Sequence, residues 1–129
     1  MADERRYRLG DLQLRILKVL WARGPGSVED VRRGLGRRRR PAYTTVATVL
    51  RRMEADGLVQ HEAQGRRFIY RPAVSPDEVT GGMVDDLLER LFEGSLSEMV
   101  CHLLSRDEVD AEELERLERL IAQRKGTQP

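Results

Sequence analysis

The stretch AYTTVATVLRRMEADGLVQHEAQGRRFIY, residues 42–70, decides the fold of this chain. Its first half predicts a helix over Tyr43–Asp56, because apolar residues recur there at the i, i+3, i+4, i+7 spacing of one helix face. These apolar residues are Val46, Val49, Leu50 and Met53. The opposite face carries hydroxyl and guanidinium groups. Gly57 should end the helix, since glycine adopts the left-handed conformation without strain.

Two short strand-like runs follow this helix, at Leu58–Glu62 and Arg67–Arg71. We expect them to form a hairpin whose tip is Ala63-Gln64-Gly65-Arg66, with Gly65 supplying the turn. A helix with one polar face, followed directly by a hairpin with arginines at its tip, is typical of a recognition helix and wing. That arrangement reads duplex DNA.

The residues before this stretch predict two more helices. The first should span about Asp11–Ala22, with Trp21 as a core anchor, and a Gly-Pro-Gly sequence follows it. Ser27 and Asp30 offer a capping box for a short second helix, whose end Gly34 weakens. The predicted fold is therefore mostly α with a small β-hairpin wing: a winged helix-turn-helix domain over residues 1–72.

Residues 73–129 predict helices only. Ser75 with Glu78 forms a capping box, Ser95 with Glu98 starts a second helix, and an acidic pair at residues 110 and 113 starts a third. Three short helices with one apolar stripe each make a marginal core alone, so a C-terminal helical dimerisation domain is favoured over a monomeric bundle. The predicted dimerisation residues are Leu87, Leu88, Leu91, Phe92, Met99, Val100, Leu103, Leu117, Leu120 and Ile121.

Charge is divided in the same way along the chain. The net charge of the 129 residues is +1, yet residues 1–72 carry 17 Lys/Arg against 8 Asp/Glu, and residues 73–129 carry 6 against 14. A basic part joined to an acidic part indicates a polyanion-binding module attached to a region with another role. The alternative is that both sets of charges only solvate helix faces.

Composition narrows the class of protein. No apolar run approaches the ~20 residues that span a bilayer, and the N-terminus lacks the apolar core of a secretory signal. The single Cys101 cannot form an internal disulfide, which agrees with a reducing compartment, so we expect a cytoplasmic protein without membrane insertion. No nucleophile–base pair or phosphate-binding glycine loop stands out, so neither an enzyme nor a cofactor is expected.

The predicted DNA contacts lie on the helix of residues 43–56 and at the wing tip. Threonine hydroxyls and methyl groups can read base edges, a small Ala47 allows close approach, and the arginines are assigned mainly to phosphates. Strand alternation would point the two wing arginines to opposite faces, so that one borders the minor groove. The arginine run of residues 37–40 is either a solvated loop or a phosphate contact. The predicted DNA-binding residues are Tyr43, Thr44, Thr45, Ala47, Thr48, Arg51, Arg52, Arg66 and Arg67.

Two other kinds of function compete with this interpretation. A metal- or redox-responsive regulator could use Cys101, His102 and His61, although these residues are few and scattered for a four-ligand site. We therefore predict no metal site. A winged helix could also bind proteins rather than DNA, but the basic segregation and the threonine face argue against that use.

Three motifs together carry a family resemblance: Val19-Leu20-Trp21, Ala42-Tyr43-Thr44-Thr45-Val46 and Tyr70-Arg71-Pro72-Ala73-Val74. With Leu91-Phe92-Glu93-Gly94-Ser95 and the acidic stretch of residues 112–120, the chain resembles the BlaI/MecI family of penicillinase repressors over nearly its whole length. The resemblance implies a homodimeric transcriptional repressor that binds a palindromic operator near genes such as those of β-lactamases, and so a link to antibiotic resistance.

The resemblance also implies a route of release. In that family, a membrane sensor with a metalloprotease domain triggers repressor cleavage within the C-terminal helices. The corresponding position here is His102 and Leu103, where the better-studied members have an Asn-Phe pair. The implied partners are double-stranded DNA, a second copy of the chain and such a sensor.

Overall fold

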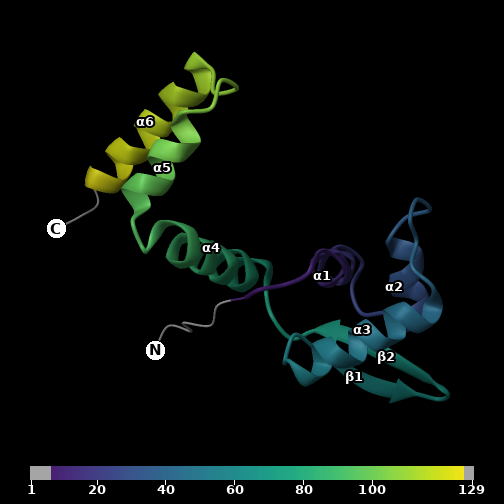
Figure 1. The fold of residues 1–129 in the computed structure, drawn as a ribbon. Coiled ribbons are helices and arrows are strands. Elements are labelled where there is room, and N and C mark those ends of the chain that lie inside the picture. Colours follow the sequence, from purple (N-terminus) through teal and green to yellow (C-terminus); the bar gives the residue numbers. More distant parts are fainter. Residues whose placement is uncertain (1–6, 127–129) are drawn as a thin grey trace. The chain divides into compact units, whose positions relative to one another are not determined.

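The computed structural model describes residues 7–126 of the chain, and in that range it is mostly helical with one antiparallel hairpin, as predicted (Figure 1). The elements follow the order α1 (Asp11–Arg23), α2 (Val28–Gly34), α3 (Tyr43–Ala55), β1 (Val59–Gln64), β2 (Arg67–Pro72), α4 (Pro76–Phe92), α5 (Leu96–Leu104) and α6 (Ala111–Gly126).

The chain divides into two compact units, Met1–Leu87 and Leu88–Pro129. The boundary predicted from the sequence lay between residues 72 and 73, at the end of the wing. The compact N-terminal unit instead continues into α4, because Val79, Gly82 and Asp86 of this helix are buried. The assignment of DNA binding to one part and dimerisation to the other stays a prediction.

The core of the N-terminal unit is formed by the apolar stripes that the helical spacing indicated. Its most deeply buried side chains come from α1, α2, α3, β1 and α4: Ile16, Leu17, Leu20, Val31, Val46, Leu50, Met53, Val59 and Val79. Val49, also expected inside, is only partly buried at the edge of this cluster. Trp21 packs on the cluster as expected, and its indole Nε1–H donates to the carbonyl oxygen of Val74 at 2.9 Å.

The helix starts follow from local capping. Ser27 caps α2, with its hydroxyl accepting from the Asp30 N–H at 3.1 Å while the Asp30 carboxylate accepts from the Ser27 N–H at 3.0 Å. Ser75 and Glu78 form the same reciprocal pair before α4. The hydroxyl of Ser95 and the Asp110 carboxylate likewise accept from backbone N–H groups three residues on. These side chains satisfy helix N–H groups that would otherwise lack partners.

The hairpin tip is shorter than the sequence suggested. β1 and β2 pair antiparallel from Val59↔Pro72 to Gln64↔Arg67, so Ala63 and Gln64 belong to the strand and only Gly65 and Arg66 form the turn. Gly65 has a φ of 63°, as in two-residue hairpin turns that place glycine first. The expectation of a four-residue tip was therefore wrong.

Two close contacts set the geometry of this unit. Gly26, before α2, pairs with Tyr70 of β2 through both backbone hydrogen bonds, at 2.8 and 3.0 Å, and so attaches the hairpin to the helices. Gly34 lies against α1, where an added Cβ would come within 2.5 Å of a Val19 methyl carbon. The sequence assigned Gly34 only to a weak helix end, whereas its main effect is close α1–α2 packing.

The C-terminal unit buries little of its apolar surface. Neither α5 nor α6 contains a buried residue in the described part of the chain, although both have an apolar stripe. Side chains such as Leu96, Leu120 and Ile121 are more than half exposed. Within residues 7–126, no helix has both the length and the apolar character needed to cross a membrane.

Candidate nucleic-acid interface

The outer face of α3 presents the residues predicted to contact DNA. Val46, Leu50 and Met53 turn inward and hold the helix on the core, which leaves the other face in solvent. Ala47 is half-buried, consistent with a position between the two faces. The exposed members of the predicted set on this helix are Tyr43, Thr44, Thr45, Thr48, Arg51 and Arg52.

Charges at the start of α3 differ from those of the other helices. The first turns of α1, α2, α4, α5 and α6 contain acidic residues, whereas the first turn of α3 contains none. The residue before α3 is Ala42, which makes no side-chain cap. The positive end of the helix dipole is therefore not neutralised locally, and an anion can approach the first-turn N–H groups.

The polar groups of this face are only loosely engaged within the protein. Arg51 Nη2 lies 3.4 Å from Thr48 Oγ1, a long hydrogen bond between residues one turn apart. Arg52 makes no ion pair or side-chain hydrogen bond with the described residues. Both guanidinium groups can therefore bind an incoming partner without first breaking a strong contact within the protein.

The two wing arginines have different environments. Arg66 is exposed in the turn and has no ion-pair partner within residues 7–126. Arg67, the first residue of β2, donates through Nη2 to the Asp30 carboxylate at 3.2 Å. Strand alternation does not apply to this pair, because Arg66 lies in the turn and not in a strand. Which of the two arginines borders the minor groove stays a prediction.

Asp30 is held ionised by its surroundings. The backbone N–H and then the hydroxyl of Ser27 lower the pKa of this carboxyl below its usual value of 3.8, with smaller contributions from Arg67 and Arg33. A hydrogen bond to a carboxylate favours its charged form, as does a nearby guanidinium. The same carboxylate therefore caps α2 and binds the wing.

The wing and the start of α3 share one pocket. A volume of about 390 Å³ is lined by Tyr43 from α3, by the turn residue Arg66 and by Arg67 and Phe68 from β2, with Ser27, Val28 and Glu29 at its α2 side. Tyr43 and Phe68 are each about half exposed there. The structure thus brings the first predicted DNA-contact residue of α3 together with both predicted contact residues of the wing.

One contact at this surface was not predicted from the sequence. His61 of β1 places Nδ1 2.6 and 2.8 Å from the two carboxylate oxygens of Glu54 in α3, and its backbone N–H also donates to Glu54 at 3.3 Å. The His61 ring lies between Phe68 and Tyr70, at centroid distances of 4.6 and 5.4 Å. Burial raises the pKa of the Tyr70 hydroxyl, and the Glu54 charge adds to that shift. Strand alternation could have placed His61 on the inner face, but nothing local identified Glu54 as its partner.

The arginine run before α3 is only partly solvated. Arg40 donates to the carbonyl oxygens of Gly36 at 2.7 Å and Arg33 at 3.4 Å, so it closes the end of α2. Arg37 and Arg38 are exposed and have no described partner. At least these two of the four arginines thus remain candidates for phosphate contact.

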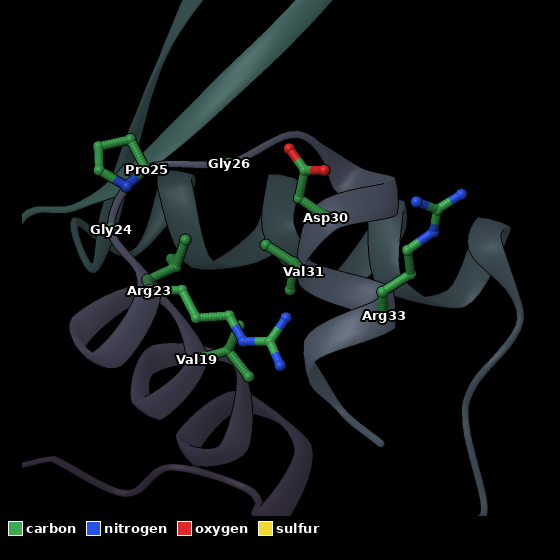
Figure 2. Close-up of a pocket in the computed structure, with 9 residues that line it drawn as sticks. Val19, Arg23, Gly24, Pro25, Gly26, Asp30, Val31 and Arg33 are labelled. Carbon is green, nitrogen blue, oxygen red and sulfur yellow. The ribbon is translucent and has the colours of Figure 1, made fainter. Parts of the chain in front are cut away.

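A separate pocket of about 330 Å³ lies where α1 leads into α2 (Figure 2). Its lining includes Val19 and Arg23 of α1, Val31 and Arg33 of α2, and the Gly24-Pro25-Gly26 connection. Figure 2 shows the Arg23 side chain extending between the two helices. None of the predicted DNA-binding residues lines this pocket.

The residues of the metal- or redox-responsive alternative each have neighbours within their own unit. In the N-terminal unit, His61 of the wing is bound to Glu54 of α3. In the C-terminal unit, Cys101 is exposed on α5 beside His102. The His102 ring faces Phe92, at a centroid distance of 6.0 Å. Within residues 7–126, no three His, Cys, Asp or Glu side chains are arranged to hold a metal ion. No observation favours this alternative over DNA binding.

The predicted dimerisation residues have a common property: each retains contact with solvent. Half of them are exposed: Leu91, Val100, Leu103, Leu120 and Ile121. The other half are half-buried: Leu87, Leu88, Phe92, Met99 and Leu117. The C-terminal apolar stripes are therefore incompletely covered by the subunit itself.

A recognition-type helix, a wing and a basic surface occur together in a chain whose residues 9–123 match the family model for penicillinase repressors. The chain belongs to this family. It is a DNA-binding transcriptional repressor of the BlaI type and not an enzyme.

Relatives of the penicillinase repressor family match along most of this chain. The transcriptional regulator BlaI of Mycobacterium tuberculosis is 38% identical over 118 residues, which cover 90% of this chain and 84% of that protein. The penicillinase repressor of Bacillus licheniformis is 25% identical over 119 residues, covering 92% and 93%. The solution structure of the DNA-binding domain of the repressor BlaI aligns with a TM-score of 0.50 at 24% identity, covering 60% of this chain and 93% of that one. The last comparison supports the winged-helix fold.

Proposed function

We propose that two copies of this repressor bind one palindromic operator, each inserting α3 into a major groove while its wing lies over the adjacent backbone. Thr44, Thr45 and Thr48 read base edges in this arrangement, and Ala47 allows the helix to approach a thymine methyl group. Arg51 and Arg52 bind phosphates. Tyr43, Arg66 and Arg67 hold the backbone between helix and wing.

The exposed polar face of α3 is the observation that carries this proposal. Its threonines and arginines project from a helix whose other face is packed on the core, so they are presented on a rigid element. The absence of acidic residues from its first turn and the excess of Lys/Arg up to residue 72 favour a polyanion at this surface.

The C-terminal helices support the dimer. Their apolar side chains remain partly or largely exposed in a single subunit, and continuous exposed apolar surface usually marks an interface. The acidic surface of this region would also repel DNA, so it suits subunit association better than DNA binding. A two-fold dimer would place two copies of α3 on half-sites about one helical turn apart, ~34 Å.

Release by proteolysis is the remaining part of the proposal. A membrane sensor metalloprotease would cut the chain at His102 and Leu103, both of which are exposed near the end of α5. Because Leu103 also belongs to the predicted dimer interface, the cut would act on a dissociated or opened subunit. Loss of α6 would then weaken the dimer and remove the tethering that makes the second half-site contact effectively intramolecular.

Selection of duplexes from a random-sequence pool by the purified full chain tests the proposal. We expect a palindromic consensus, two protein chains per duplex by light scattering, and a footprint on both half-sites. Recovery of unrelated sequences would contradict sequence-specific binding. A single chain bound to an asymmetric site would contradict the dimer while retaining DNA recognition.

A further inference from the structure

We propose that Glu54 and His61 form a clamp that positions the wing on the recognition helix, so that Arg66 reaches DNA at the same time as α3. This inference rests on the proposed function and assigns Glu54 and His61 a role as positioning residues. Neither residue touches DNA in this arrangement. Each acts through the placement of the hairpin.

The contact is multiple rather than a single exposed ion pair. The Glu54 carboxylate accepts from the His61 backbone N–H at 3.3 Å and lies 2.6 and 2.8 Å from Nδ1 through its two oxygens. Both side chains are only about one-third exposed. A histidine Nδ1 can donate in its charged form and in one neutral tautomer, so the link does not depend on a single protonation state.

The wing holds the imidazole in place from the opposite side. His61 pairs across the hairpin with Tyr70, and its ring contacts Phe68 as well, at centroid distances of 5.4 and 4.6 Å. These contacts fix the ring orientation, so that Nδ1 points at the helix. The clamp therefore connects α3 to both strands of the hairpin.

The other polar contacts of the hairpin do not join β1 to α3 at the position of His61. Gly26 binds Tyr70 through the backbone, and Asp30 binds Arg67, so both of these contacts join β2 to the region of α2. The Leu58 N–H bonds the Met53 carbonyl oxygen at the connection between α3 and β1. Among the described residues, the contact between Glu54 and His61 is the one polar contact that joins the rest of β1 to α3. Val59 at the start of β1 is buried in the core, so the base of the hairpin stays in place without this contact. Loss of the contact would loosen the outer part of β1 and leave the placement of the turn to the Asp30–Arg67 pair.

The turn residue that depends on this placement is Arg66. It is exposed and has no ion-pair partner in the described range, so its position follows that of the hairpin. If the hairpin is held at a fixed angle to α3, Arg66 is already in place before DNA binds. Binding then loses no conformational entropy through ordering of the hairpin. A hairpin that moves freely would lose that advantage.

The test is a double-mutant cycle between Glu54→Ala and Arg66→Ala, measured by fluorescence anisotropy with the duplex selected by the wild-type protein. We expect Arg66→Ala alone to weaken binding about tenfold, as for loss of one arginine–phosphate contact. In the Glu54→Ala background, the same change should weaken binding no more than about twofold, because the arginine is no longer placed.

Glu62→Ala is the matched control. Glu62 pairs with Arg71 within the hairpin and makes no described contact with α3, yet its removal changes the net charge by the same amount as Glu54→Ala. Arg66→Ala should retain its tenfold effect in this background. Equal Arg66→Ala effects in the wild-type, Glu54→Ala and Glu62→Ala backgrounds would overturn the clamp, as would an Arg66→Ala change without effect in the wild type.

If circular dichroism shows that Glu54→Ala does not fold, a second pair of variants tests the same contact from the His61 side. The amide nitrogen introduced by His61→Asn can donate where Nδ1 does, whereas the side chain introduced by His61→Leu cannot. Arg66→Ala should keep its effect in the His61→Asn background and lose it in the His61→Leu background, and an equal effect in both would overturn the proposal. If the wild type selects no duplex, the proposed function itself fails; if it binds but shows no coupling, only the clamp fails.

Discussion

Arg67 in the wing donates to the carboxylate of Asp30 in α2, with Nη2 and Oδ2 3.2 Å apart. The same Asp30 oxygen accepts from the Ser27 N–H and so caps the helix. A residue that the sequence marks only as a capping partner thus also binds the hairpin. DNA phosphates at the wing would compete with Asp30 for the Arg67 guanidinium, since both are anionic acceptors.

The lowered pKa of Asp30 predicts acid sensitivity. Its charged form is favoured in the folded protein, so the resulting stability is present above the usual carboxyl pKa of 3.8 and is lost as pH falls through the lower folded-state value. Thermal unfolding from about pH 5 down to about pH 2 covers this loss, and over that range stability should fall less steeply for Asp30→Asn than for the wild type. Asp85→Asn, at an exposed position on α4, is the control and should follow the wild-type slope.

Thr48→Ala should reduce specificity. Loss of a base contact is expected to weaken binding to the selected duplex by about 1–3 kcal/mol, with a much smaller change for a scrambled duplex. Thr80→Ala, an exposed threonine on α4, should change neither affinity. Anisotropy titrations with the two duplexes measure the ratio, and an unchanged ratio for Thr48→Ala would remove this residue from the reading face.

Arg52→Ala should act on all sequences alike. Its guanidinium is assigned to a phosphate, so binding to selected and scrambled duplexes should weaken together, and the slope of log K against log salt should flatten by about one per subunit. Titrations over a series of salt concentrations check this, with Arg119→Ala on α6 as the exposed-arginine control. A loss restricted to the selected duplex would instead identify Arg52 as a base contact.

Leu120→Asp should dissociate the proposed dimer. Leu120 is 53% exposed in the subunit, and a charge in an apolar interface would be buried without a partner. Sedimentation equilibrium should show at least about a tenfold weaker dimer, whereas Gln123→Asp, at another exposed site on α6, should leave it nearly unchanged. If Leu120→Asp stayed as dimeric as the wild type, the α6 stripe would lie outside the interface.

A chain truncated after Cys101 should keep its N-terminal fold but lose most of its affinity for the selected duplex. The truncation removes the end of α5 and all of α6, including Leu117, Leu120 and Ile121. Circular dichroism and anisotropy separate the two effects. Retention of wild-type affinity would exclude dimer loss as the means of release.

The sequence predicted best what depends on neighbours along the chain. Ser27, Ser75, Ser95 and Asp110 bond groups three residues away, so their capping motifs predicted the helix starts correctly. The apolar spacing in α3 likewise identified its buried face and therefore its exposed one. Local patterns thus predicted the presented surface of the candidate interface.

Contacts between separate elements could not be predicted in this way. Glu54–His61 and Asp30–Arg67 each join residues from different elements, and many other carboxylates were equally plausible partners on charge alone. Gly34 shows the same limit, because its closeness to Val19 depends on how α1 crosses α2. The wing tip was predicted too long since neither Ala63 nor Gln64 has a clear strand or turn preference.

The hydrogen bond from Trp21 to Val74 gives the protein a built-in optical label. Trp21 is the single tryptophan among the 129 residues, and its indole binds the segment that leaves the wing. Its emission will therefore respond when that segment detaches, whereas α5 and α6 contribute no tryptophan signal. Tryptophan fluorescence can thus follow melting of the N-terminal unit separately from dissociation of the C-terminal helices, in one unmodified sample.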